Sequence, residues 1–153
     1  MAYLSMNSPV GPLTILEEGG AIVVLEWGRA DSPEPQIQTD LLEKARSQLN
    51  EFFDGKRKDF FLPLAPKGSV FQCAVWGRLS RIPYGSAQTY GDIAKAMESS
   101  PRAVGGACGR NPIPIIIPCH RVVAMGGKLG GFSGGSGLVT KKVLLRLEGY
   151  PVT

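Results

Sequence analysis

Residues 99–122, SSPRAVGGACGRNPIPIIIPCHRV, hold most of what this sequence says about its fold. Serine followed by proline is a common way to begin a helix, so the stretch predicts a helix over Arg102 to Arg110. The prolines at positions 112 and 114 end that helix. The apolar run Ile115 to Ile117 then predicts a buried strand that delivers Pro118-Cys119-His120 to its end.

Cys119 and His120 are neighbours, and His120 is the only histidine of the chain. A free thiol is only a few per cent ionised near pH 7, so a working cysteine needs a base or positive surroundings. The pair therefore predicts a cysteine nucleophile with its base, against the alternative of a buried structural thiol. Cys73 and Cys108 lie on predicted helices among apolar neighbours and are interpreted as packing residues.

Two further helices are predicted before this stretch, over Val70 to Leu79 and over Tyr90 to Glu98. Thr89 is a good N-cap for the second of these, with Asp92 three residues later. Together with the helix at Arg102 to Arg110 it makes a helix-turn-helix candidate. An ordinary helical hairpin in a core would give the same pattern.

The first third of the chain reads as three short strands, Ala2 to Met6, Gly11 to Glu17 and Ala21 to Trp27, followed by an amphipathic helix over Asp40 to Phe53. Prolines and a glycine then mark a boundary. We expect an N-terminal support domain over residues 1–62, a linker over 63–67 and a second domain over 68–153. A glycine-rich loop follows His120, over Ala124 to Gly137, and Thr140 to Leu147 predicts the last helix.

Charge is divided unevenly between the two parts. Residues 1–66 hold 6 Lys and Arg against 10 Asp and Glu, whereas residues 67–153 hold 11 against 3. A surface of one sign favours a polyanionic partner, although a solvated basic face would look the same. With three cysteines, one histidine and no CxxC pair, neither a structural metal nor a disulfide framework is expected.

Eight motifs occur in order along residues 68–150. They are Phe71-Gln72, Val75-Trp76, Ile82-Pro83-Tyr84-Gly85, Thr89-Tyr90-Gly91, Arg102-Ala103-Val104-Gly105, Asn111-Pro112, Ile117-Pro118-Cys119-His120-Arg121-Val122 and Gly130 to Gly135. Together they resemble the O6-alkylguanine-DNA alkyltransferases. The resemblance implies an α+β fold: a small N-terminal antiparallel sheet plus helix, of ribonuclease H-like outline, and a mainly helical C-terminal domain with a winged helix-turn-helix.

By that resemblance the protein acts in direct-reversal DNA repair. The alkyl group of O6-alkylguanine, or less well of O4-alkylthymine, moves irreversibly onto Cys119 in a single turnover. The nucleotide is first flipped out of the duplex, because its O6 atom is stacked inside it. The implied partner is double-stranded DNA. No cofactor or metal is needed, and we expect a monomer in the cytoplasm, associated with the nucleoid, or in a nucleus.

The resemblance also assigns roles to individual residues. The catalytic group is Cys119 as nucleophile, His120 as base through a bound water, Glu148 as the carboxylate that holds the histidine tautomer, Tyr90 as proton donor to the leaving guanine, and Asn111 as the residue that orders the turn before Cys119. The expected DNA contacts are Arg102 as the intercalating arginine, Tyr90 against the phosphate of the flipped nucleotide, Ala103, Gly105, Arg110 and Arg121. The expected base pocket is Pro114, Phe132 and Ser133.

Other classes stay open on the sequence alone. A protein that binds alkylated DNA without repairing it would share the fold, but proteins of that kind lack the acceptor cysteine. A helix-turn-helix regulator would use the Arg102 to Arg110 helix to read bases. A thiol hydrolase would use Cys119 and His120 with water.

Overall fold

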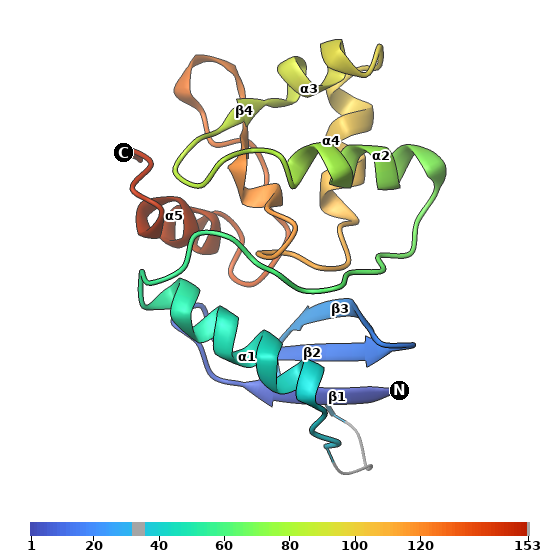
Figure 1. Ribbon diagram of the computed structural model, residues 1–153. Helices are drawn as coiled ribbons and strands as arrows, with labels where there is room; N and C mark the ends of the chain where they lie inside the picture. Colours follow the sequence, from blue (N-terminus) through green and yellow to red (C-terminus); the bar gives the residue numbers. More distant parts are fainter. Residues whose placement is uncertain (32–35, 153) are drawn as a thin grey trace. The chain divides into compact units, whose positions relative to one another are not determined.

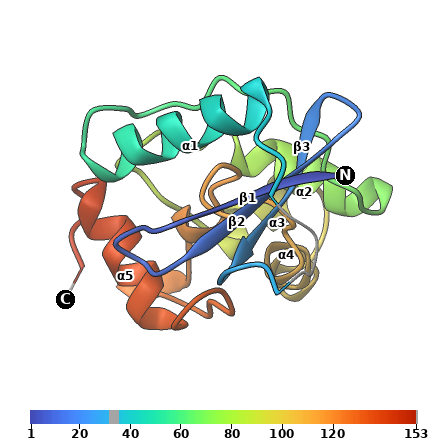
Figure 2. The ribbon, with the colours of Figure 1, turned by 90° about the horizontal axis from the view of Figure 1, so that it is seen from below.

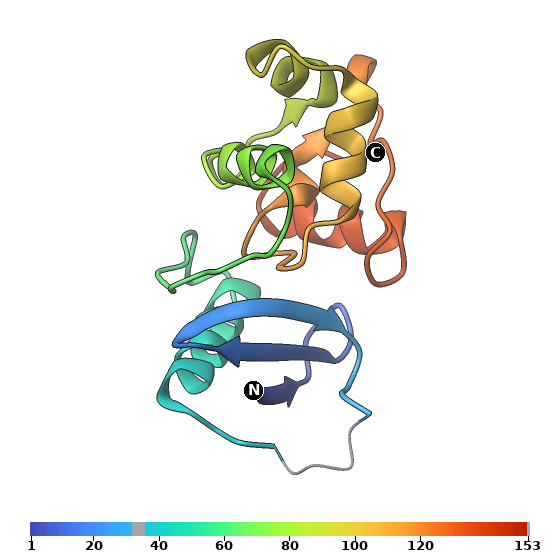
Figure 3. The ribbon, with the colours of Figure 1, turned by 90° about the vertical axis from the view of Figure 1, so that its right-hand side faces the viewer.

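The computed structural model describes residues 1–31 and 36–152. The chain forms two compact units, Met1–Lys67 and Gly68–Thr153. The first unit contains three strands and one helix: β1 (Ala2–Met6), β2 (Leu13–Glu18), β3 (Ala21–Trp27) and α1 (Asp40–Phe53). The strands form an antiparallel sheet in the order β1-β2-β3, and α1 packs against one face of it (Figures 1 and 3).

Burial alternates in β1, where Leu4 and Met6 are buried and Ser5 is half-buried, as in a strand with one covered face. In β2 the three consecutive residues Leu13 to Ile15 are all buried. α1 runs in roughly the direction of the strands (Figure 2). Its N-cap is Thr39, whose hydroxyl accepts a hydrogen bond of 3.1 Å from the Leu42 backbone N–H.

The second unit is mainly helical. Its elements are α2 (Val70–Leu79), β4 (Gln88–Thr89), α3 (Tyr90–Ala96), α4 (Pro101–Gly109), the 3₁₀ turn η1 (Cys119–Arg121), β5 (Val122–Val123), the 3₁₀ turn η2 (Met125–Gly127) and α5 (Leu138–Leu147). β4 and β5 pair in parallel. Helix α4 packs against both α2 and α3 (Figure 3). Together the two units confirm the predicted α+β architecture.

Local chemistry sets the ends of α3 and α4. Thr89 and Asp92 form the predicted capping box of α3, with both hydrogen bonds at 3.0 Å. Ser100 caps α4, and Pro101 is its first residue. The turn between the two helices passes through Glu98, whose φ is 53°. Trp76 fixes α4 to α2 through a 2.9 Å hydrogen bond from its indole N–H to the Ala107 carbonyl. The described helices include none that is both long and apolar enough to span a bilayer.

The strand predicted over Ile115 to Ile117 is wrong. The three isoleucines are buried, but Ile115 has a φ of 72°, which no strand residue adopts. Backbone hydrogen bonds between residues close in sequence fold the segment back on itself. The Ile117 N–H donates to the Ile113 carbonyl at 2.9 Å, and the Cys119 N–H donates to the Ile117 carbonyl at 2.8 Å. An apolar run without a helical or strand period indicates that the segment is buried but not which structure it adopts. Here the buried segment is a compact turn.

The packing role predicted for Cys73 is also wrong. Its side chain is exposed on α2, whose buried residues are Val75, Trp76 and Leu79. Cys108, on α4, is buried as predicted.

Candidate active site

Cys119 begins the turn η1 and is buried, with 8% of its surface exposed. Asn111 orders the chain that leads to it. Its side-chain N–H donates to the Ile117 carbonyl at 2.7 Å, and its side-chain oxygen accepts from the Ile113 N–H at 3.0 Å. The Asn111 side chain also lowers the pKa of the Cys119 thiol. One amide therefore braces the turn and favours the thiolate.

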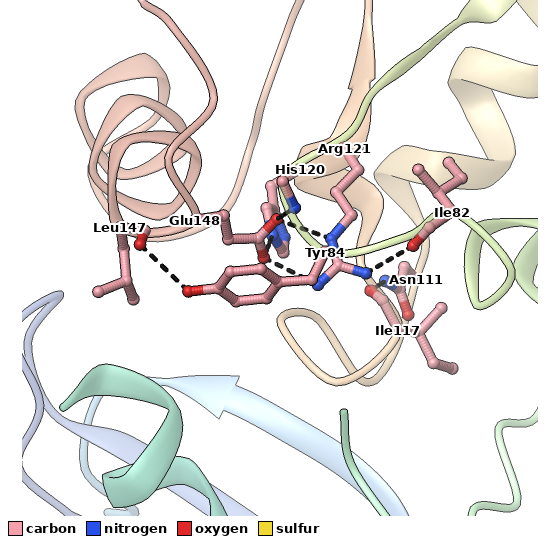
Figure 4. A network of polar contacts seen from close by, with 9 residues as sticks. Ile82, Tyr84, Asn111, Ile117, His120, Arg121, Leu147 and Glu148 are labelled. Atoms are coloured by element: carbon pink, nitrogen blue, oxygen red, sulfur yellow. Dashed lines mark hydrogen bonds and ion pairs between the residues drawn. The ribbon is translucent and has the colours of Figure 1, made fainter. Parts of the chain in front are cut away.

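His120 and Arg121 share a single carboxylate, that of Glu148 (Figure 4). His120 Nε2 lies 2.7 Å from Glu148 Oε2. Arg121 donates to the same carboxylate from two nitrogens, Nε to Oε1 at 2.8 Å and Nη2 to Oε2 at 2.9 Å. All three side chains are buried. The structure thus brings together the predicted base and carboxylate, and adds an arginine to them.

The end of α5 places that carboxylate. Glu148 is the C-cap of α5, and Gly149 follows with a φ of 81°, a conformation that glycine adopts without strain. The Tyr150 N–H closes the turn on the Leu145 carbonyl at 3.0 Å. The helix therefore stops where its last side chain faces η1.

Electrostatics fix the proton positions in this network. Burial raises the pKa of Glu148, but hydrogen bonds from His120 and Arg121 outweigh it and hold that pKa at about 2. Burial lowers the pKa of His120 below its ordinary value, against the opposing effect of Glu148. At pH 7 the carboxylate is ionised and the imidazole is neutral, so Nε2 carries the hydrogen that Glu148 accepts. Nδ1 is then the basic nitrogen.

Nδ1 of His120 is buried and has no hydrogen-bond partner among the described residues. Buried polar atoms are nearly always paired with protein or water, so an unpaired one marks a place where another group binds. Burial raises the pKa of Cys119, while Asn111 and the charge of Lys141 lower it. The resting cysteine is therefore a neutral thiol, and the next residue in the chain holds a buried imidazole nitrogen with an unused lone pair.

Lys141 belongs to this site, although the basic composition of residues 67–153 predicts only a surface charge at position 141. It is fully buried, and its ammonium donates to the carbonyls of Val122 and Leu129, both at 2.6 Å, and of Gly131 at 3.2 Å. Burial lowers its pKa to about 8. A signal was present in the sequence, because Lys141 shares a helical face with Leu144 and Leu145 at the spacing i, i+3, i+4.

Tyr90 closes the other side of the glycine-rich loop. Its hydroxyl donates to the Gly131 carbonyl at 3.3 Å, and the Lys141 ammonium lies 5.7 Å from its ring centre. A side chain at position 130 would place Cβ 2.8 Å from the Tyr90 ring, so only glycine allows this approach. Burial raises the pKa of Tyr90 to about 12, and the hydroxyl keeps its proton.

The remaining predicted residues lie in several environments. Arg102, Ala103 and Arg110 are exposed on α4, and Gly105 is half-buried against the Tyr90 ring. Pro114 is buried in the turn before Cys119, Phe132 is half-buried and Ser133 is exposed. The prediction that Arg121 contacts DNA does not fit its position. Only 6% of it is exposed, and its nitrogens are already bonded to Glu148 and to the Ile82 carbonyl.

No group of three or more His, Cys, Asp or Glu side chains suited to a metal ion is found in the described part of the chain. What the geometry defines is a buried cysteine followed in the chain by a histidine that is hydrogen-bonded to a carboxylate, in a unit that also carries the helix pair α3 and α4.

Two family models match the chain. The ribonuclease-like domain of 6-O-methylguanine DNA methyltransferase matches residues 1–66, and the DNA binding domain of the same enzyme matches residues 70–150. The chain therefore belongs to the 6-O-methylguanine-DNA methyltransferase family.

Curated relatives agree with this assignment. The methylated-DNA–protein-cysteine methyltransferase of Methanosarcina acetivorans is 43% identical over 156 residues, which cover 97% of this chain and 99% of that protein. The constitutive enzyme of Bacillus subtilis is 41% identical, over 95% of this chain and 94% of its own.

Solved structures share the fold. OGT of Mycobacterium tuberculosis in complex with DNA has a TM-score of 0.86 at 39% identity, covering 97% of this chain and 92% of that one. Atl1 of S. pombe, in complex with damaged DNA containing O6-carboxymethylguanine, has a TM-score of 0.50 at 28% identity, covering 57% of this chain and 82% of that one.

Proposed function

We propose that this protein repairs alkylated DNA by moving the alkyl group of O6-alkylguanine from duplex DNA onto Cys119. The observation that carries the proposal is the state of His120. Its Nε2 donates to an ionised Glu148, and its Nδ1 is buried without a hydrogen-bond partner among the described residues, on the residue that follows Cys119 in the chain. Such a nitrogen serves as a general base when a water molecule bridges it to the sulfur.

Transfer then follows in balanced steps. His120 Nδ1 takes the thiol proton of Cys119 through the bridging water, and the thiolate attacks the alkyl carbon. The S–C bond forms as the C–O6 bond breaks, and guanine leaves with the electron pair. Tyr90 gives its hydroxyl proton to the guanine, and the proton held by His120 passes through water to the Tyr90 oxygen, which restores the neutral phenol and the neutral imidazole. The thioether is stable, so each molecule acts once.

Residues in and around the glycine-rich loop stabilise the guanine as it leaves. The Tyr90 hydroxyl keeps its proton, so it can donate to the departing guanine once it exchanges its bond to Gly131. We place Ser133 near O6, and Pro114 and Phe132 against the flipped base. Lys141 lowers the pKa of Cys119 through its charge, which favours the attacking thiolate.

DNA engagement is assigned to α4. Arg102 is exposed at its second position, with Ala103 beside it and Arg110 at its C-terminal end. Small side chains allow a helix to approach the duplex closely, and Arg102 fills the space that the flipped nucleotide leaves. The unit over residues 1–67 acts as a support, and the protein works as a monomer in the cytoplasm, on chromosomal DNA.

The test uses duplex DNA that carries a labelled O6-methyl group. The wild-type protein is expected to retain one equivalent of label after denaturation, and Cys73→Ser, a control at an exposed thiol, is expected to match it. Cys119→Ser should bind the same DNA and retain none. Release of the label into solution would indicate a hydrolase, binding without any transfer would indicate a lesion-binding or regulatory protein, and either result overturns the proposal.

A further inference from the structure

We propose that Arg121 is a positioning residue for the base, which holds Glu148 in place and keeps His120 unprotonated for its task. This role rests on the proposed function, in which His120 is the base. It differs from a DNA contact, because the guanidinium faces the interior and not the surface.

Hydrogen bonds to Glu148 show how firmly the carboxylate is held. Oε1 accepts from Arg121 Nε at 2.8 Å and from the Gly85 N–H at 3.3 Å. Oε2 is shared between Arg121 Nη2 at 2.9 Å and His120 Nε2 at 2.7 Å. A two-pronged arginine contact fixes the plane of a carboxylate, which a single imidazole bond does not. Arg121 therefore aims the Oε2 lone pair at His120.

Arg121 is itself anchored from outside its own turn. Its Nη1 donates to the Ile82 carbonyl at 2.7 Å, and the Tyr84 ring centre lies 5.8 Å from the guanidinium carbon. The Tyr84 hydroxyl in turn donates to the Leu147 carbonyl at 3.1 Å, next to Glu148 (Figure 4). The segment after α2, the turn η1 and the end of α5 are thus joined at one guanidinium.

The charges around His120 come from two elements. Arg121 lies on its own turn, and Glu148 and Lys141 lie on α5. Burial lowers the pKa of His120 first of all, the Glu148 carboxylate raises it, and the cations Arg121 and Lys141 lower it. The positive charge of Arg121 opposes the attraction of the Glu148 carboxylate for a second proton on His120. Without Arg121, Glu148 would favour the imidazolium, which cannot accept the thiol proton.

Two substitutions separate this role from a structural one. Arg121→Met keeps the length of the side chain and removes charge and donors, while Arg121→Lys keeps the charge and loses the two-pronged contact. Lys44→Met, on the exposed face of α1, is the matched control for loss of a positive charge. Single-turnover transfer from the free base O6-benzylguanine is measured against pH, and the His120 imidazole is titrated by ¹⁵N NMR.

For Arg121→Met we expect the acid limb of the pH–rate profile and the His120 titration to move together to higher pH. Each pKa unit of that movement lowers transfer about tenfold on the acid limb, with recovery at alkaline pH. Arg121→Lys should keep the wild-type titration, and it carries the test if Arg121→Met does not fold. Lys44→Met should match the wild type.

Two results overturn the proposal. One is a His120 titration that does not move in Arg121→Met, or wild-type transfer by Arg121→Lys, which lacks the two-pronged contact. The other is a salt dependence of duplex binding whose slope falls by about one in Arg121→Met, as for a lost phosphate contact. The NMR titration needs no alkyl transfer, so it tests Arg121 even if Cys119 proves not to be the acceptor.

Discussion

Glu148→Gln perturbs the site most sharply, because it keeps the shape of the side chain and removes the charge that His120 and Arg121 share. The pKa of Glu148 falls from an ordinary 4.5 to about 2. That fall corresponds to about 3 kcal/mol of folded-state stability at neutral pH. Breaking a buried ion pair from one side costs about 3–5 kcal/mol in other proteins, which is the same order.

The sign of the pH dependence follows from the lowered pKa. A carboxyl group whose pKa is lower in the folded state stabilises the protein above pH 4.5, and that contribution is lost as the pH falls toward 2. Urea unfolding at pH 7 should therefore find Glu148→Gln weaker than the wild type by about 3 kcal/mol, or about 6–12 °C in Tm. The difference should shrink steadily between pH 5 and 2.

Transfer should suffer more than stability in the same variant. A neutral amide does not hold the His120 tautomer, and loss of a positioned general base costs about 10²–10⁴ in rate. Glu98→Gln is the control, since Glu98 is an exposed carboxylate of the same unit. If Glu148→Gln and the wild type were equally stable at pH 7 and lost stability in the same way as the pH falls, Glu148 would not be an ionised carboxylate held by hydrogen bonds from both His120 and Arg121.

Three other perturbations follow from the structure. Arg102→Ala should slow transfer from duplex DNA far more than from free O6-benzylguanine, and equal slowing in rapid-quench assays would exclude a role in nucleotide flipping. Lys141 has a pKa lowered from 10.5 to about 8, so the unfolded chain binds the extra proton between these values and stability should rise with pH across that window. Urea titrations of Lys141→Met should lack this rise, and its presence would contradict the assignment. Gly130→Ala would place Cβ 2.8 Å from the Tyr90 ring at a φ of 73° and should lower both the thermal unfolding midpoint and transfer; an unchanged Tm would show that the loop adjusts freely.

Helix ends and strand alternation were predictable because their causes are local. The capping box of Thr89 and Asp92 and the Pro101 start of α4 depend on residues within one turn of each other. The carboxylate partner was expected from the family resemblance, and its placement depends on where α5 ends.

Arg121, Lys141 and the isoleucine turn were not predictable in this way. A basic residue in a basic half of the chain indicates a surface charge, and only tertiary packing shows that Arg121 pairs with Glu148 and that Lys141 meets three carbonyls. Burial of such groups depends on partners ten or more residues away. Ile115 was misjudged because β-branched residues favour strands, whereas the Asn111 side chain stabilises a compact turn here.

The central claim is that the sulfur of residue 119 receives the alkyl group. Tandem mass spectrometry of the wild-type protein, after reaction with an equimolar O6-methylguanine duplex, tests it directly. We predict one added methyl group, found only on the peptide that contains Cys119, with Cys73 and Cys108 unmodified. An unmodified Cys119, or a methyl group on either other cysteine, would contradict the account.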